Sequence, residues 1–387
     1  MPKPITLKAR FSSLDIFRGA TVALMILVNN PGSGEHVYAP LDHAPWNGCT
    51  PTDLVFPFFL FAVGNAMAFV MPSLRDGGTN FFWKKTLRRT ALIFIIGLLL
   101  NWFPFVRYGT DGHLEAKTFA NLRILGVLQR IALCYFFSSV ILFYAGPKRA
   151  LYIGFVILLA YWGICVWANP SDPFSLNGWF GTKIDKAILG ENHMYHGEGI
   201  AFDPEGLMST PPAVVQVILG YLVGEFIITR GKTAEMLNKV FVVGAILIFT
   251  GYCWDMLFPI NKKIWTSSYV VYTTGLAMLI LGVLINSVEF KNTSRSWTRF
   301  FTVFGKNPLF IFVLSGVLGR FYLLFRIHDG EKNGQPVFKN LGGWMYDHIF
   351  SPAFGLVNGS LAYAVAHVLL FWLICVWLDK RKIYIRV

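Results

Sequence analysis

Long apolar stretches recur along this 387-residue chain, and each is close to the length that crosses a membrane. A helix needs about 20 apolar residues to cross the roughly 30 Å of hydrocarbon in a bilayer. The sequence predicts ten spanning helices, over 13–30, 52–72, 89–106, 123–144, 150–168, 210–229, 239–259, 268–288, 301–325 and 357–378. The semi-apolar stretch 341–356 would add an eleventh span, lie re-entrant in the membrane or lie along its surface.

The composition agrees with a polytopic membrane protein. Only 14% of the residues are charged and 55% are hydrophobic, whereas a soluble domain carries about 25% charged residues. Disordered chains, fibrous proteins and ordinary cytosolic enzymes are therefore excluded. We expect an all-α integral membrane protein that forms one transmembrane domain over 1–387, with outer loops at 31–51, 169–209 and 326–356.

The net charge of +13 is explained better by a membrane than by nucleic acid, for which no binding motif is present. Lysine and arginine collect in the cytoplasmic loops of membrane proteins. With a cytoplasmic N-terminus, 22 of the 34 basic residues fall on that side and 11 fall in the opposite loops, which predicts that both termini are cytoplasmic. Residues 1–18 are basic and no cleavage site follows the first apolar run, so we expect that run to be a retained helix.

Cysteine and histidine spacing gives no support for a metal site. The five cysteines lack a CxxC pair and the histidines lack an HExxH pair. The sequence therefore predicts neither a disulfide framework nor a zinc site. Cys49 stands alone in a polar loop, where we interpret it as a small turn residue rather than a nucleophile.

The first apolar run carries a polar stripe. Asp15 and Arg18 are three residues apart and can pair on one helical face. Arg18 and Asn29 also share a face, about 16 Å apart along the helix axis. The stripe would place a cation that can bind phosphate near one end and an amide donor near the other. The alternative is a snorkelling arginine and an asparagine that ends the helix.

The loop that follows contains a candidate base. Thr50, Pro51 and Asp53 match a helix N-terminus, so capping is the simplest role for Asp53. His43 lies just before this helix start and close to Trp46. It is either a surface residue or a base for an amine or alcohol proton, because imidazole titrates near neutral pH.

Further charged residues lie at the borders of later spans. Arg123 and Arg130 are two helical turns apart, and an arginine inside a span costs about 2.5–3.5 kcal/mol, so Arg130 should face a polar cavity. Asp203 and Glu205 could orient a sugar hydroxyl or amine, or stabilise a turn. Lys263 could bind a ligand or anchor its segment at the membrane interface.

Taken in order, these segments resemble the transmembrane acetyltransferase family typified by heparan-α-glucosaminide N-acetyltransferase. The resemblance implies that cytosolic acetyl-CoA donates its acetyl group to the amine of a glucosamine-type sugar on the far side of the membrane. The large lumenal N-terminal region of the lysosomal enzyme is missing, so the chain looks like a bacterial relative in the inner membrane. The matching stretches are 13–19, 43–48, 53–57, 123–130, 203–207, 261–265 and the basic-aromatic tail 380–387.

The resemblance also implies roles for individual residues. It makes His43 the active-site histidine and places Asn29 near the acetyl carbonyl. Our hypothesis adds a cofactor-binding set and a set that binds the acceptor sugar. The cofactor set is Arg18, Arg123, Arg130 and Lys263, and the acceptor set is Asp53, Asp203, Glu205 and Trp46.

Three alternatives remain at this point. The acetyl group could pass directly to the amine or through an acetyl-histidine intermediate. The chain could instead transport amino sugars or N-acetylglucosamine, although no internal repeat of the kind found in many transporters is evident. It could also be an O-acyltransferase acting on cell-envelope polysaccharide. We further expect membrane lipid and a second copy of the chain, in a homodimer, as partners.

Overall fold

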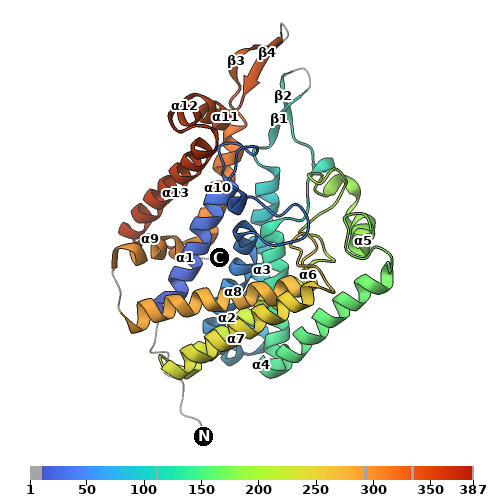
Figure 1. The fold of residues 1–387 in the computed structure, drawn as a ribbon, viewed down its shortest axis with the longest axis vertical. Helices are drawn as coiled ribbons and strands as arrows, with labels where there is room; N and C mark the ends of the chain where they lie inside the picture. Colours follow the sequence, from blue (N-terminus) through green and yellow to red (C-terminus); the bar gives the residue numbers. More distant parts are fainter. Residues whose placement is uncertain (1–10, 110–111, 292–294, 333–334, 386–387) are drawn as a thin grey trace.

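Helices make up most of the computed structural model, which describes residues 11–109, 112–291, 295–332 and 335–385 (Figure 1). The basic residues 1–10 and the end of the tail at 386–387, both used in the sequence predictions, lie outside these ranges. The longer helices are α1 (Ser12–Asn29), α2 (Val55–Asp76), α3 (Gly78–Trp102), α4 (Val127–Ala168), α6 (Thr210–Arg230), α7 (Ala234–Asp255), α8 (Ser267–Ile285), α10 (Pro308–Tyr322) and α13 (Leu356–Lys380).

Shorter helical pieces connect them. Helix α5 (Phe180–Leu189) lies in the long loop between α4 and α6, and α9 (Arg295–Lys306) precedes α10. The others are α11 (Leu341–Met345), α12 (Ser351–Phe354), the 3-10 turns η1 (Ala39–Leu41), η2 (Pro51–Leu54), η3 (Phe119–Asn121) and η4 (Glu191–His193), and the π-helical turns η5 (Asn286–Phe290) and η6 (Tyr346–Phe350).

Within the described residues, seven helices are long and apolar enough to cross a bilayer, or eight if α9 and α10 form one bent span. Two features account for the difference from ten. Helix α3 carries Lys84, Lys85, Arg88 and Arg89 in its first half, which leaves a short apolar remainder. Helix α4 is 42 residues long and includes two of the predicted spans, separated by a break at Gly146, where φ is 73°.

The predicted span 301–325 is also divided. Helices α9 and α10 meet at an angle of 80°, because Asn307 leaves the helical conformation and Pro308 begins α10 without a backbone donor. The candidate eleventh span is a run of short helical turns from Leu341 to Phe354. Its length of about 21 Å is too small to cross the hydrocarbon.

Two small hairpins add strands to the expected all-helical fold. Strands β1 (Val106–Tyr108) and β2 (Leu114–Ala116) pair antiparallel, as do β3 (Ile327–Lys332) and β4 (Gln335–Lys339). Both hairpins lie in loops of the helical bundle and at the same end of the molecule, the top of Figure 1. These two-stranded hairpins are additions to the loops of the helical domain and do not form a larger sheet.

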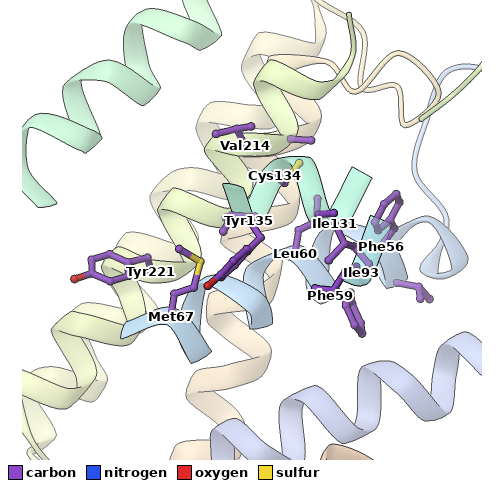
Figure 2. Packing of buried hydrophobic residues seen from close by; sticks show 14 of the residues in the cluster. Phe56, Phe59, Leu60, Met67, Ile93, Ile131, Cys134, Tyr135, Val214 and Tyr221 are labelled. Atoms are coloured by element: carbon purple, nitrogen blue, oxygen red, sulfur yellow. The ribbon is translucent and has the colours of Figure 1, made fainter. Parts of the chain in front are cut away.

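The core is centred on α2, which packs against α1, α4, α6 and α8. Figure 2 shows its side chains meeting those of α4 and α6. The backbones of helices α2 and α6 are in close contact at Gly64. A Cβ added at this glycine would lie only 2.1 Å from the Val217 carbonyl oxygen. Small residues permit such contacts between membrane helices. This packing fixes the start of α2, and with it the site described next.

Candidate functional site

A cavity of about 370 Å³ lies where segment 42–53, the start of α4 and the turn 261–265 meet. We call it the histidine cavity. Its lining brings together seven residues that the sequence singled out and several that it did not. The lining residues used below are Asn29, His43, Trp46, Asp53, Arg123, Tyr195, Glu198, Glu205, Lys262 and Lys263.

His43 is held by a buried carboxylate. Its Nδ1 lies 2.7 Å from Oδ1 of Asp53, and the Asp53 side chain is only 2% exposed. The other carboxylate oxygen accepts hydrogen bonds from the backbone N–H groups of Ala44 at 3.0 Å and Thr50 at 3.1 Å. Asp53 therefore caps the helix start, as its spacing from Thr50 predicts, and also orients the histidine. When the Nδ1–H of the neutral imidazole donates a hydrogen bond to Asp53, the unprotonated Nε2 is free to accept a proton.

Lys262 completes this cluster, and the sequence analysis did not select it. Its Nζ lies 3.0 Å from Nδ1 of His43 and 3.3 Å from Oδ1 of Asp53. Burial lowers the pKa of Lys262, whereas the nearby carboxylates of Asp53 and Glu205 oppose that shift. Lys262 is thus a third member of the His43–Asp53 unit.

The neighbouring lysine has a different position. Nζ of Lys263 donates to the Pro45 carbonyl at 2.7 Å and pairs with Glu198 at 2.7 Å. Trp46 lies within 5.7 Å of the same ammonium and donates its indole N–H to the Phe174 carbonyl. Both predicted residues line the cavity, where Lys263 contacts Pro45, Glu198 and the ring of Trp46, a member of the predicted acceptor set.

Arg123 forms the most extensive charge pairing of the site. Its Nη2 lies 2.6 Å from carboxylate oxygens of both Asp203 and Glu205, and its guanidinium lies over the Tyr195 ring at 4.8 Å. Asp203 is fully buried, whereas Glu205 lines the cavity. Of the three predicted acceptor carboxylates, Asp53 and Glu205 line the cavity and Asp203 does not.

Arg130 is buried away from the described cavities. Its Nη2 donates to the Gly206 carbonyl at 2.9 Å and also contacts Ser209, and the guanidinium lies 5.2 Å from the Trp265 ring. The polar surroundings expected for an arginine inside a span are supplied by the 203–209 loop. Arg130 fastens this loop to α4.

Asp185 of α5 supports the same loop from the other side. Its Oδ1 accepts the backbone N–H groups of Leu207 at 3.1 Å and Met208 at 3.2 Å, while its Oδ2 is buried without a hydrogen-bond partner. Burial raises the pKa of Asp185 to about 6.

Asn29 is shared by three neighbouring cavities. Besides the histidine cavity it lines one of about 330 Å³, which includes Arg123 and Arg320, and one of about 160 Å³. The smallest includes His43 and Lys262 and continues between helices along the apolar side chains of Met25 and Phe59. Asn29 therefore lies where polar and apolar spaces meet.

Arg18 lines a separate cavity of about 480 Å³, which we call the tail cavity because the C-terminal segment forms one wall. Arg18 pairs with Asp15 at 2.8 Å, as predicted, and donates from Nε to the Gly305 carbonyl at 2.9 Å. The three arginines proposed to bind the cofactor together do not share a cavity. The charged and aromatic lining residues are Asp15, Arg18, Arg89, Lys306 and Tyr384.

No group of three residues suited to hold a metal ion occurs within the described ranges. The five cysteines, all described, are free thiols. Burial raises the pKa of Cys49 to about 12, which leaves the thiol a poor nucleophile at neutral pH. His43, Lys262 and Glu205 line the histidine cavity and carry groups that can take part in acid–base chemistry.

Comparison with known proteins identifies relatives of the chain. Residues 10–184 match the family model described as heparan-alpha-glucosaminide N-acetyltransferase, catalytic. The human heparan-alpha-glucosaminide N-acetyltransferase is 26% identical over 400 aligned positions, covering 87% of this chain and 57% of the human protein. The mouse protein of the same name is 25% identical, covering 86% and 57%. The chain thus spans little more than half the length of these relatives.

Proposed function

Starting from this relationship to the heparan-alpha-glucosaminide N-acetyltransferase family, we propose that the chain is a transmembrane acetyltransferase. Acetyl-CoA from the cytosol donates the acetyl group, and the amine of a glucosamine-type sugar accepts it at the histidine cavity on the periplasmic side of the inner membrane. The observation that carries this proposal is the grouping of His43, Asp53, Lys262 and Asn29 around one cavity.

Two cavities support a path for the donor. Ile93 and Leu309 line the tail cavity, whereas Gly97 and Phe312, one helical turn farther along α3 and α10, line the cavities that contain Asn29. One turn is about 5.4 Å, so little wall separates the two spaces. An extended pantetheine arm would run along α1 between them, with its charged end near Arg18 and its thioester near Asn29.

The reaction at the histidine cavity follows from the position of each group. The acceptor nitrogen attacks the thioester carbon, a C–N bond forms, and the C–S bond breaks to release CoA as a thiolate. Nε2 of His43 takes the proton that nitrogen loses, while Asp53 accepts the hydrogen bond from Nδ1. This proton later passes to the CoA thiolate or to water.

Asn29 and the cavity walls have complementary tasks. The Asn29 amide would donate to the thioester oxygen as negative charge develops, an interaction worth about 3–4 kcal/mol in known oxyanion holes. Glu205 would hold the sugar amine or a hydroxyl, and the Trp46 ring would contact an apolar face of the sugar. Arg123 and Asp203 act on the acceptor indirectly, because they position Glu205.

The direct test uses purified protein in detergent with acetyl-CoA and glucosamine, and it measures the release of free CoA. His43→Ala should lower kcat by roughly 10²–10⁴-fold, the usual contribution of a general base. His196→Ala is the matched control, since His196 is exposed and does not line the histidine cavity. Near-normal turnover of His43→Ala would remove His43 from this role.

A second measurement separates the two chemical routes. Intact-protein mass analysis after incubation with acetyl-CoA alone detects an added acetyl group if an acetyl-histidine forms. Direct transfer predicts no added mass and initial-rate kinetics in which both substrates must bind before CoA leaves. Turnover in detergent also argues against simple transport, which requires a sealed vesicle.

A further inference from the structure

The C-terminal tail leaves α13, reverses direction and returns to the end of α9. Lys382 has a positive φ of 56° at this reversal, and the Ile383 N–H donates back to the Leu378 carbonyl at 2.9 Å. The tail thereby reaches the tail cavity, where Tyr384 and Ile385 form part of the lining.

The buried side chain of Asn307 helps to hold the tail in this position. Asn307 is 1% exposed and lies at the bend between α9 and α10. Its Nδ2 donates to the Ile383 carbonyl at 3.1 Å, and its Oδ1 accepts the Ile385 N–H at 2.7 Å. The amide thus holds the tail backbone through a donor and an acceptor, as a neighbouring β-strand would.

Side chains around Tyr384 link the tail to the charged wall of the cavity. Nζ of Lys306 lies 2.5 Å from Oδ1 of Asp379 and 5.7 Å from the centre of the Tyr384 ring. The Tyr384 hydroxyl donates to the same Asp379 oxygen at 3.0 Å. Tyr384 is 40% exposed even with these contacts, so part of the residue remains accessible to a ligand.

The rest of the cavity suits an anionic, aromatic ligand. Arg18, Arg89 and Lys306 line it together with one acid, Asp15. Nε of Arg89 is buried without a hydrogen-bond partner. The volume of the tail cavity, about 480 Å³, is within the usual range for ligand pockets, about 300–1,000 Å³. Arginine and lysine bind phosphate by charge-assisted hydrogen bonds, and an aromatic ring stacks on any nucleobase.

We propose that tail residues 381–385 form part of the donor site and recognise the nucleotide end of acetyl-CoA. Tyr384 contacts the adenine, the three cations bind the phosphates, and Asn307 is a positioning residue that acts through the tail. This inference rests on the proposed function, which makes acetyl-CoA the donor. Arg386 and Val387 are not needed for it.

The test compares two donors in the full-length protein. Acetyl-CoA carries the nucleotide and S-acetyl-pantetheine lacks it. Tyr384→Ala should raise KM for acetyl-CoA about tenfold, in line with the loss of one stacking contact, and leave KM for S-acetyl-pantetheine unchanged. Asn307→Ala should shift KM in the same direction. Tyr384→Phe keeps the ring and loses the hydrogen bond to Asp379, so it should raise KM for acetyl-CoA less than Tyr384→Ala does.

Two results would overturn the inference. One is an unchanged KM for acetyl-CoA in Tyr384→Ala, and the other is an equal rise in KM for acetyl-CoA and for S-acetyl-pantetheine. The unfolding temperature of each variant is recorded, so that a general loss of structure is recognised.

A binding measurement keeps this inference separate from the proposed function. Adenosine 3′,5′-bisphosphate should raise the unfolding temperature of the unchanged protein and of Tyr384→Phe, but not of Tyr384→Ala. If the nucleotide binds in this pattern while no acetyl acceptor is used, the nucleotide site stands and the acetyltransferase proposal fails. If the nucleotide stabilises all variants equally, or none, the tail has no part in binding it.

Discussion

The histidine cavity and the tail cavity differ in how their charges are balanced. The histidine cavity is lined by Arg123, Lys262 and Lys263, and each lies against a carboxylate that also lines this space: Glu205, Asp53 and Glu198, respectively. The tail cavity is lined by three cations and one acid.

This difference in charge balance indicates different ligands. A set of fixed charges in which each cation is paired with a carboxylate orients a base without attracting a strongly charged molecule. The ion pairs also hold the charged side chains in place. An excess of cations raises the local concentration of an anion. The balanced cavity therefore fits a site of chemistry, and the cationic cavity fits a site for a phosphate-bearing ligand.

The largest expected effect tests whether charge pairing at the histidine cavity also stabilises the fold. Arg123→Met leaves Asp203 buried without its partner and should lower the free energy of unfolding by about 3–5 kcal/mol. Arg89→Met in the tail cavity is the matched variant. It loses a guanidinium–Tyr135 contact at 4.7 Å, worth about 1 kcal/mol. Denaturant unfolding in detergent measures both, and equal losses would contradict the comparison.

The next effect concerns the orientation of His43. Asp53→Asn keeps the size of the side chain and an oxygen that can accept the Ala44 and Thr50 N–H groups, but it removes the charge that faces Nδ1. We expect kcat to fall about 100-fold with little change in KM for acetyl-CoA, since the donor phosphates bind elsewhere. Steady-state kinetics check this. A change confined to KM would mean that Asp53 acts in binding.

A pH-dependent effect is expected at Asp185. The folded-state pKa of about 6 lies above the ordinary value of this carboxyl. Its stabilising contribution is therefore complete below about pH 4 and is lost as the pH rises through 6. Asp185→Asn keeps an acceptor for Leu207 and Met208 without a charge. It should be more stable than the unchanged protein by about 3 kcal/mol at pH 7.5, and nearly equal to it at pH 4.

Unfolding temperatures measured across this pH range provide the test. A constant difference between the two proteins at every pH would show that ionisation of Asp185 does not contribute.

The smallest effect sharpens the role of the cationic cavity. Arg89→Gln should raise KM for acetyl-CoA several-fold, because one charge-assisted contact of about 1 kcal/mol is lost. The increase should shrink at high salt, where exposed charges are screened, and KM for glucosamine should not change. Kinetics at low and high salt measure it. A larger effect on glucosamine than on acetyl-CoA would reverse the assignment of the two cavities.

Local sequence features determined a large part of this protein. The apolar runs predict the helical membrane class, and short spacings predict the Asp15–Arg18 pair and the Asp53 cap, both of which the structure contains. Such interactions are decided by the helix repeat and by turn geometry, which act over a few neighbouring residues. The position of His43 beside a helix start left it either a surface residue or a base, and only the family resemblance implied that it is the active-site histidine.

Tertiary structure alone decided which distant groups meet. Adjacent lysines 262 and 263 are equivalent in sequence, and only the fold of their turn directs the first toward His43 and the second toward Glu198. Arg123 is separated by 80 residues from Asp203, and Asn307 by 76 residues from the tail carbonyl that it binds. No local repeat encodes these contacts, because they depend on how whole helices pack.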